Sequence, residues 1–171
     1  MSASTPAARI QANLQELFQG NTAAGNPYIK FQLASNTVLL SMERVEETLI
    51  VDAGQITLLP SMPPSVIGIM NSRDRVFCVF DLAQMLTLPT KLIASRQYQI
   101  IVLQTTDPTP IQVGFAIDSF QGIMRLTAEQ IQPSLNSSLD RLAPYISGAV
   151  TVDTTLPVLE FDCILEALTA V

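Results

Sequence analysis

Three aspartates occupy positions from which a carboxylate could do chemistry, because Asp81, Asp118 and Asp162 each follow an apolar run directly. In doubly wound α/β proteins a phosphoacceptor aspartate stands at such a strand end, with further acidic residues for Mg²⁺ and a lysine nearby. The apolar runs of this chain are not separated by long helical segments, so that setting is missing. We therefore interpret Asp81 and Asp162 as caps of short helices and Asp118 as a turn residue.

Other residues that catalysis requires are scarce. The chain has no histidine, which removes the usual general base, the commonest metal ligand and any histidine phosphoacceptor. It has no Gly-x-Ser-x-Gly motif and no phosphate-binding glycine loop, and neither Lys30 nor Lys91 stands in a Gly-Lys-Ser/Thr context. Cys78 and Cys163 lack C-x-x-C spacing, so we expect small buried apolar side chains rather than a disulfide or a zinc site. The sequence predicts no enzymatic activity, no cofactor and no metal.

Charge and composition narrow the classes of partner. The chain has 171 residues, a net charge of -6 and a pI of about 4.4, and its basic residues are scattered singly. Without a basic stripe, nucleic acid and anionic membrane surfaces are not expected partners. Only 14% of the residues are charged, which favours exposed apolar surface and hence protein partners. No apolar stretch approaches ~20 residues and no secretory signal begins the chain, so we expect no direct membrane insertion and a cytoplasmic location.

Residues 1–26 predict an extension that holds one amphipathic helix and a linker. Thr5 suits the N-cap and Pro6 the first helical position. Apolar residues follow at i, i+4, i+7 and i+8 and form one stripe, made of Ile10, Leu14, Leu17 and Phe18. We expect this stripe to dock on a partner or a second protomer, with packing on the chain's own barrels as the alternative.

Residues 27–171 predict a mainly β domain. Short runs rich in Val, Ile and Phe alternate with turn residues and predict ten strands, over 28–33, 37–42, 46–51, 66–70, 75–80, 98–104, 111–117, 122–126, 145–152 and 156–161. Brief helical turns should follow Asp81 and Thr127, and Thr127-Ala128-Glu129-Gln130 matches a capping box. Asp162 should begin a C-terminal helix that reaches Leu168. Many short strands without long helices between them are typical of all-β barrels or sandwiches.

A weak internal repeat divides the strands. The pairs Gln55-Ile56 and Gln130-Ile131 correspond, each followed by a proline, a glycine and an apolar strand that ends in Phe-Asp. The glycines and the Phe-Asp pairs recur about 80 residues apart. We interpret the repeat as two similar small β-barrels, which need a shared interface because neither half is large enough for a stable core of its own.

The stretch from Leu59 to Leu82 contains Leu-Pro, then Pro, a glycine, Asn-x-Arg and an apolar strand that ends in Asp-Leu. Two further segments are Val-Gly-Phe-Ala-Ile-Asp at 113–118 and Tyr-Ile-Ser-Gly at 145–148, with Phe-Asp at 161–162. In this order and spacing, the segments resemble the signature of the CheW-like domain family, and the resemblance covers roughly residues 28–168. Ser72, Asp74 and Cys78 stand where the family usually has Leu, Gly and Pro, which indicates a specialised member. Asp tolerates left-handed geometry, so the turn at Asp74 is expected to form.

The resemblance implies two intertwined SH3-like five-stranded β-barrels packed together. The short N-terminal helix and the C-terminal helix are predicted from the residue pattern, and the N-terminal helix is an extension beyond the resemblance. It also implies a non-enzymatic adaptor that couples methyl-accepting-type receptors to a CheA-type histidine kinase in a taxis or motility pathway. The implied contacts are the regulatory domain of the kinase and the cytoplasmic tip of the receptor. The partner-binding positions carried over by motif are Val45, Glu47, Gly68, Arg73, Gly114 and Ile123, and Arg73 is expected to form an ion pair with Glu47.

Two other classes remain as alternatives. A nucleic-acid-binding small β-barrel would show a basic surface and exposed aromatic side chains. An enzyme of unknown type is disfavoured by the missing histidine and nucleotide motifs.

Overall fold

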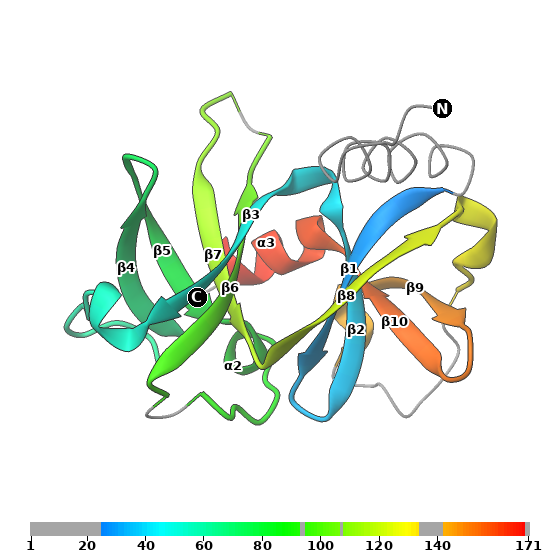
Figure 1. Cartoon of the computed structure of the whole chain (residues 1–171), viewed down its shortest axis with the longest axis horizontal. Helices are drawn as coiled ribbons and strands as arrows, with labels where there is room; N and C mark the ends of the chain where they lie inside the picture. Colours follow the sequence, from blue (N-terminus) through cyan, green and yellow to red (C-terminus); the bar gives the residue numbers. More distant parts are fainter. Residues whose placement is uncertain (1–24, 93–94, 107, 134–141, 170–171) are drawn as a thin grey trace, which may run out of the picture.

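The computed structural model describes residues 25–92, 95–106, 108–133 and 142–169. Within them, all ten predicted strands form and make two five-stranded sheets, each curled into a small barrel (Figure 1). The strands are β1 (Asn26–Leu33), β2 (Asn36–Ser41), β3 (Val45–Asp52), β4 (Val66–Ser72), β5 (Arg75–Asp81), β6 (Gln97–Gln104), β7 (Gln112–Ile117), β8 (Ser119–Leu126), β9 (Ile146–Thr151) and β10 (Thr155–Leu159). The expected mainly β fold of two five-stranded barrels is confirmed. The expected N-terminal stripe of Ile10, Leu14, Leu17 and Phe18 lies outside the described residues.

Helical segments in the described residues are short. The α-helices are α2 (Leu82–Met85) and α3 (Phe161–Thr169), and the 3-10 turns are η1 (Met42–Arg44), η2 (Ala53–Gln55), η3 (Ala128–Gln130) and η5 (Ala143–Tyr145). The last strand was predicted to run to Phe161, but β10 ends at Leu159 and Phe161 begins α3. Phe161 is buried and packs edge-on against Phe115, with 6.3 Å between ring centroids, so tertiary packing overrides its strand propensity.

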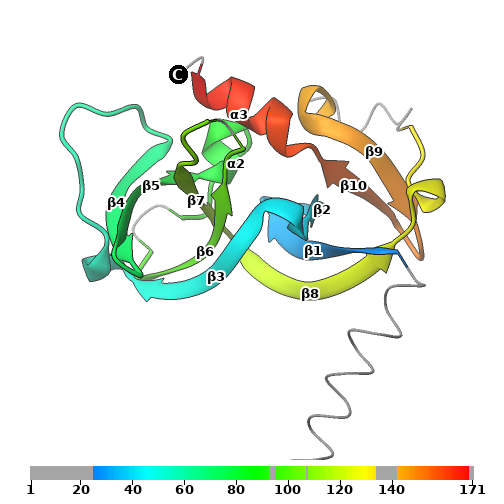
Figure 2. The ribbon, with the colours of Figure 1, turned by 90° about the horizontal axis from the view of Figure 1, so that it is seen from above.

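Strand order shows that the two repeats exchange strands. The first barrel has the order β8-β1-β2-β10-β9 and the second β3-β6-β7-β5-β4. The first repeat supplies β1 to β5 and the second β6 to β10. At each place in the two strand orders, equivalent strands of different repeats stand opposite each other: β8 and β3, β1 and β6, β2 and β7, β10 and β5, β9 and β4. Each barrel therefore takes two strands from one repeat and three from the other. Sequence halves and barrels do not coincide, and β3 and β8 are the strands that cross between the barrels (Figure 2).

The repeated glycines mark where each barrel closes. After β3 and after β8 the chain bends back and makes an isolated β-bridge to β4 and β9, respectively. A Cβ atom on Gly68 would lie 2.2 Å from the carbonyl oxygen of Thr57, and one on Gly148 would lie 2.8 Å from that of Gln132. Real Cβ atoms do not approach that closely, so both positions need glycine for close backbone packing.

Predicted caps are confirmed in two of three cases. The carboxylate of Asp81 accepts a hydrogen bond from the backbone N–H of Gln84, 3.2 Å, and caps α2. The side chain of Gln130 accepts from the backbone N–H of Thr127 at 2.8 Å, as the predicted capping box requires. Asp162 is not a cap, because α3 begins one residue earlier and places this carboxylate within the first turn.

The largest apolar core lies between the two barrels. Phe31 and Leu33 of the first barrel meet Ile101 and Phe115 of the second, and all four are fully buried. Helix α3 lies across both barrels and closes this core through Ile164 (Figure 2). The interiors of the individual barrels hold smaller clusters. The barrels therefore share an apolar core, as the sequence predicted.

None of the described helices has the length and apolar character needed to cross a membrane. The described residues also contain no group of three or more His, Cys, Asp or Glu side chains that could hold a metal ion.

Candidate functional site

The hairpin between β4 and β5 ends in a strained two-residue turn. Ser72 pairs with Arg75, and the turn residues Arg73 and Asp74 have φ angles of 52° and 61°, both left-handed. Turns of this kind favour Asn-Gly or Asp-Gly, since non-glycine residues lose energy at positive φ. The turn predicted at this departure from the family pattern therefore forms without glycine and presents Arg73 at its tip.

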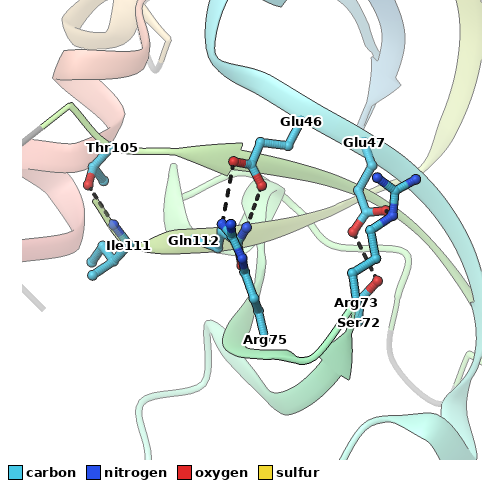
Figure 3. Close-up of polar contacts among 8 residues, drawn as sticks. All are labelled: Glu46, Glu47, Ser72, Arg73, Arg75, Thr105, Ile111 and Gln112. Carbon is cyan, nitrogen blue, oxygen red and sulfur yellow. Dashed lines mark hydrogen bonds and ion pairs between the residues drawn. The ribbon is translucent and has the colours of Figure 1, made fainter. Parts of the chain in front are cut away.

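Edge strand β3 holds this hairpin through Glu47. One carboxylate oxygen of Glu47 accepts a hydrogen bond from the hydroxyl of Ser72 at 2.9 Å, and the other pairs with Nε of Arg73 at 3.2 Å (Figure 3). The Glu47 side chain is only 13% exposed, whereas that of Arg73 is 79% exposed. The predicted ion pair is confirmed, and a mostly buried carboxylate anchors a mostly exposed guanidinium.

A second carboxylate of the same strand makes a parallel contact. Glu46 lies 3.8 Å from Nη1 of Arg75 and also accepts a hydrogen bond from the side-chain amide of Gln112 on β7. These side chains and those of the Glu47 contact line a depression of about 380 Å³. Glu46 is exposed, whereas Glu47 is mostly covered by the hairpin.

These side chains cross the seam of the second barrel. Strands β3 and β4 are the two ends of its sheet order and are not paired as strands. The carboxylates of β3 therefore reach the β4–β5 hairpin through side chains instead of backbone hydrogen bonds. We call the set Glu46, Glu47, Ser72, Arg73, Arg75 and Gln112 the hairpin clamp.

The other positions inferred from the resemblance lie elsewhere. Val45 begins β3 and is half-buried, and Ile123 on β8 of the first barrel is 62% exposed. Gly68 and Gly114 are buried; a Cβ on Gly114 would lie 2.9 Å from the ring of Phe77. Of the six positions inferred from the resemblance, the structure brings Glu47 and Arg73 into contact. Gly68 and Gly114 have a packing role.

Both the fold and this geometry can be compared with known proteins. The CheW-like domain family matches residues 27–168 of the chain. The chain belongs to this family. The chemotaxis protein CheW of Thermotoga maritima is 27% identical to this CheW-like chain over 142 residues, which is 82% of the chain and 88% of the relative. The crystal structure of the scaffolding protein TtCheW from Thermoanaerobacter tengcongensis has the same fold, with a TM-score of 0.65, 18% identity, and coverage of 80% of this chain and 89% of that chain.

A contact that sequence analysis missed links η1 to α3 in this CheW-like domain. Arg44 of η1 pairs with Asp162 of α3 at 2.7 Å and lies over the ring of Phe161, 5.4 Å from its centroid. The two charges are 118 residues apart, so no local pattern links them. The pair ties the start of α3 to the segment that leads into β3.

The aspartates singled out for possible chemistry have structural roles in the CheW-like domain. Asp81 is buried, and its carboxylate is used twice, by the backbone N–H of Gln84 and by the hydroxyl of Thr90. A carboxylate engaged in this way is poorly placed to attack a phosphoryl group. Cys78 and Cys163 are free and half-buried rather than buried, and burial together with nearby carboxylates raises the pKa of the Cys163 thiol, which disfavours the reactive thiolate.

Asp118 stands between β7 of the second barrel and β8 of the first, so it links two sheets instead of closing a tight turn. Both carboxylate oxygens are buried, and neither accepts a hydrogen bond of ordinary length from the described residues. Burial raises the pKa of Asp118; Lys91 and the backbone N–H of Ala34 oppose this rise, and the charge of Asp81 adds to it. Burial therefore disfavours the ionised form of the Asp118 carboxyl group.

Proposed function

We propose that this protein is a non-enzymatic scaffold that couples receptors of the methyl-accepting type to a CheA-type histidine kinase. Membership of the CheW-like family supports a scaffolding role in chemotaxis. The observation that carries the proposal is the hairpin clamp, in which a buried carboxylate holds an arginine that is 79% exposed. Arginine in such a setting is well suited to a protein–protein contact, because its planar group offers several donors in fixed directions.

The proposed partners are the regulatory domain of the kinase and the cytoplasmic tip of the receptor. Arg73 and Glu47 form the polar part of the proposed contact surface, and Val45 and Ile123 supply apolar contacts on the two crossover strands. The adaptor acts in the cytoplasm by tethering, which raises the effective concentration of one partner near the other. Residues 27–171 form the proposed binding domain and residues 1–26 an extension with its own docking helix.

Arg73→Ala should test the proposal directly. We expect affinity for the cognate kinase or for the receptor tip to fall at least about tenfold, or ~1.4 kcal/mol, since a truncated interface arginine loses its contacts to the partner. Calorimetric titration with each purified partner measures this change. The matched control is Arg96→Ala, because Arg96 is also exposed but lies outside the clamp. Unchanged affinity for both partners with a lowered melting temperature would show that Arg73 only steadies the hairpin.

No observation favours the alternative of a nucleic-acid-binding barrel. Among the described residues, the large exposed apolar side chains are aliphatic or methionine, namely Ile50, Leu58, Met62, Val76, Ile111, Ile123 and Val152. Binding of single-stranded nucleic acid relies on exposed aromatic rings and a basic groove. The net charge of -6 opposes such binding further.

A further inference from the structure

Ser72 has an unusual position in the hairpin clamp. Its hydroxyl donates to one oxygen of Glu47 at 2.9 Å, and this leaves the second oxygen for Nε of Arg73. A carboxylate that is 13% exposed needs hydrogen bonds to offset the loss of water. Without the Ser72 hydroxyl, the Glu47 carboxylate would be free to rotate towards other donors, and its direction relative to Arg73 would no longer be determined.

The pairing uses only part of the Arg73 guanidinium. Of its five N–H donors, the one on Nε faces Glu47. The ion pair to Glu47 runs through Nε, and the Arg73 side chain is 79% exposed, which leaves Nη1 and Nη2 accessible to a partner. The edge formed by these two nitrogens matches the two oxygens of a carboxylate, so the geometry suits an Asp or Glu side chain of a protein partner.

The backbone adds a reason for such anchoring. Arg73 and Asp74 both have positive φ, which is unfavourable for an ordinary residue and less so for Asp. A strained turn persists when its surroundings hold it in place. The contacts of Ser72 and Arg73 to Glu47, and of Arg75 to Glu46, supply that support from the neighbouring strand.

We propose that Ser72 is a positioning residue, which orients Glu47 so that the terminal nitrogens of Arg73 receive a carboxylate of the protein partner. The proposal rests on the proposed function, since it assumes that the clamp binds a partner. The Ser72 hydroxyl is used within the clamp, by Glu47. It makes partner recognition depend on a side chain that touches no partner itself.

The test compares Ser72→Ala, Ser72→Thr and Arg73→Ala in titrations with the cognate CheA-type kinase and with a receptor-tip fragment. We expect Ser72→Ala to weaken binding of the partner that contacts the clamp by about fivefold, and Ser72→Thr, which keeps the hydroxyl, to restore most of it. In the Arg73→Ala background, the Ser72→Ala change should have no further effect, because Ser72 acts through Arg73. Ser147→Ala serves as the control, since Ser147 is an exposed serine on the other barrel.

A spectroscopic measurement separates positioning from general stability. In wild-type protein, the NMR chemical shift of Arg73 Nε should report its ion pair with Glu47, and Ser72→Ala should change that shift without changing the backbone signals of β4. If Arg73→Ala weakens binding but Ser72→Ala does not, the positioning role is wrong and the proposed function stands. If neither change affects either partner, both proposals are wrong. An additive double variant would also exclude positioning, since Ser72 would then act independently of Arg73.

Discussion

Gly68→Ala should destabilise the protein strongly. The added methyl group would lie 2.2 Å from the carbonyl oxygen of Thr57 and 2.9 Å from Cγ2 of Ile56. The oxygen belongs to a backbone bridge, in which Ile69 donates to Thr57 at 2.9 Å and Thr57 donates to Ile69 at 2.8 Å. The methyl group can fit only if the bridge moves, so the substitution combines overpacking with weakened hydrogen bonds.

The expected size of the effect follows from these two contributions. Overpacking of a well-packed site costs about 1–3 kcal/mol. Each of the two bridge hydrogen bonds contributes roughly 0.5–1.5 kcal/mol. We expect a loss of about 2–4 kcal/mol in the free energy of unfolding, measured by urea denaturation. For a domain of this size that corresponds to a decrease of roughly 5–15 °C in melting temperature.

Two other glycines make the test specific. Gly148→Ala should be destabilising in the same way, because its Cβ would lie 2.7 Å from Cγ2 of Ile131 and 2.8 Å from the carbonyl oxygen of Gln132. Gly54→Ala has no heavy atom within 4 Å of its Cβ and should change stability by less than about 0.5 kcal/mol. If Gly68→Ala is as stable as Gly54→Ala, the close backbone approach described for the barrel closure is incorrect. If folded Gly68→Ala binds partners normally, Gly68 acts through packing and not through direct contact.

Three further predictions concern the charge, core and extension of the protein. Asp118→Asn should stabilise the fold near neutral pH, because the pKa of the Asp118 carboxyl is raised in the folded state. The penalty for ionising this carboxyl is absent below the unfolded pKa of about 3.9 and grows as the pH rises through the folded pKa. Equal stabilisation by the substitution at pH about 3 and near neutral pH would refute this prediction. Phe115→Ala should cost about 3–5 kcal/mol yet leave one cooperative unfolding transition by calorimetry, because Phe115 packs between the barrels; two transitions would show independent barrels. Deleting residues 2–24 should preserve cooperative unfolding and weaken partner association, and loss of cooperativity would place the N-terminal stripe in the core.

Local patterns in the sequence were sufficient for the elements of the fold. Alternating apolar residues and turn residues predicted all ten strands, because strand propensity and period act over a few neighbouring residues. The cap at Asp81 and the capping box at Thr127 were predictable for the same reason, since their partners lie three residues away. The resemblance to the CheW-like family supplied the ion pair between Glu47 and Arg73, which composition alone would not have suggested.

Tertiary structure alone decided how these elements combine. The exchange of strands between repeats depends on where β3 and β8 cross, and strand periodicity carries no information about which barrel a strand joins. A carboxylate such as that of Glu47 is usually exposed, but the hairpin tip 25 residues away covers it. The need for glycine at position 68 likewise arises from a backbone approach by Thr57, a contact that exists only once the barrel has closed. Sequence neighbours determine strands and caps, whereas burial and charge pairing in the hairpin clamp come from residues that folding brings together.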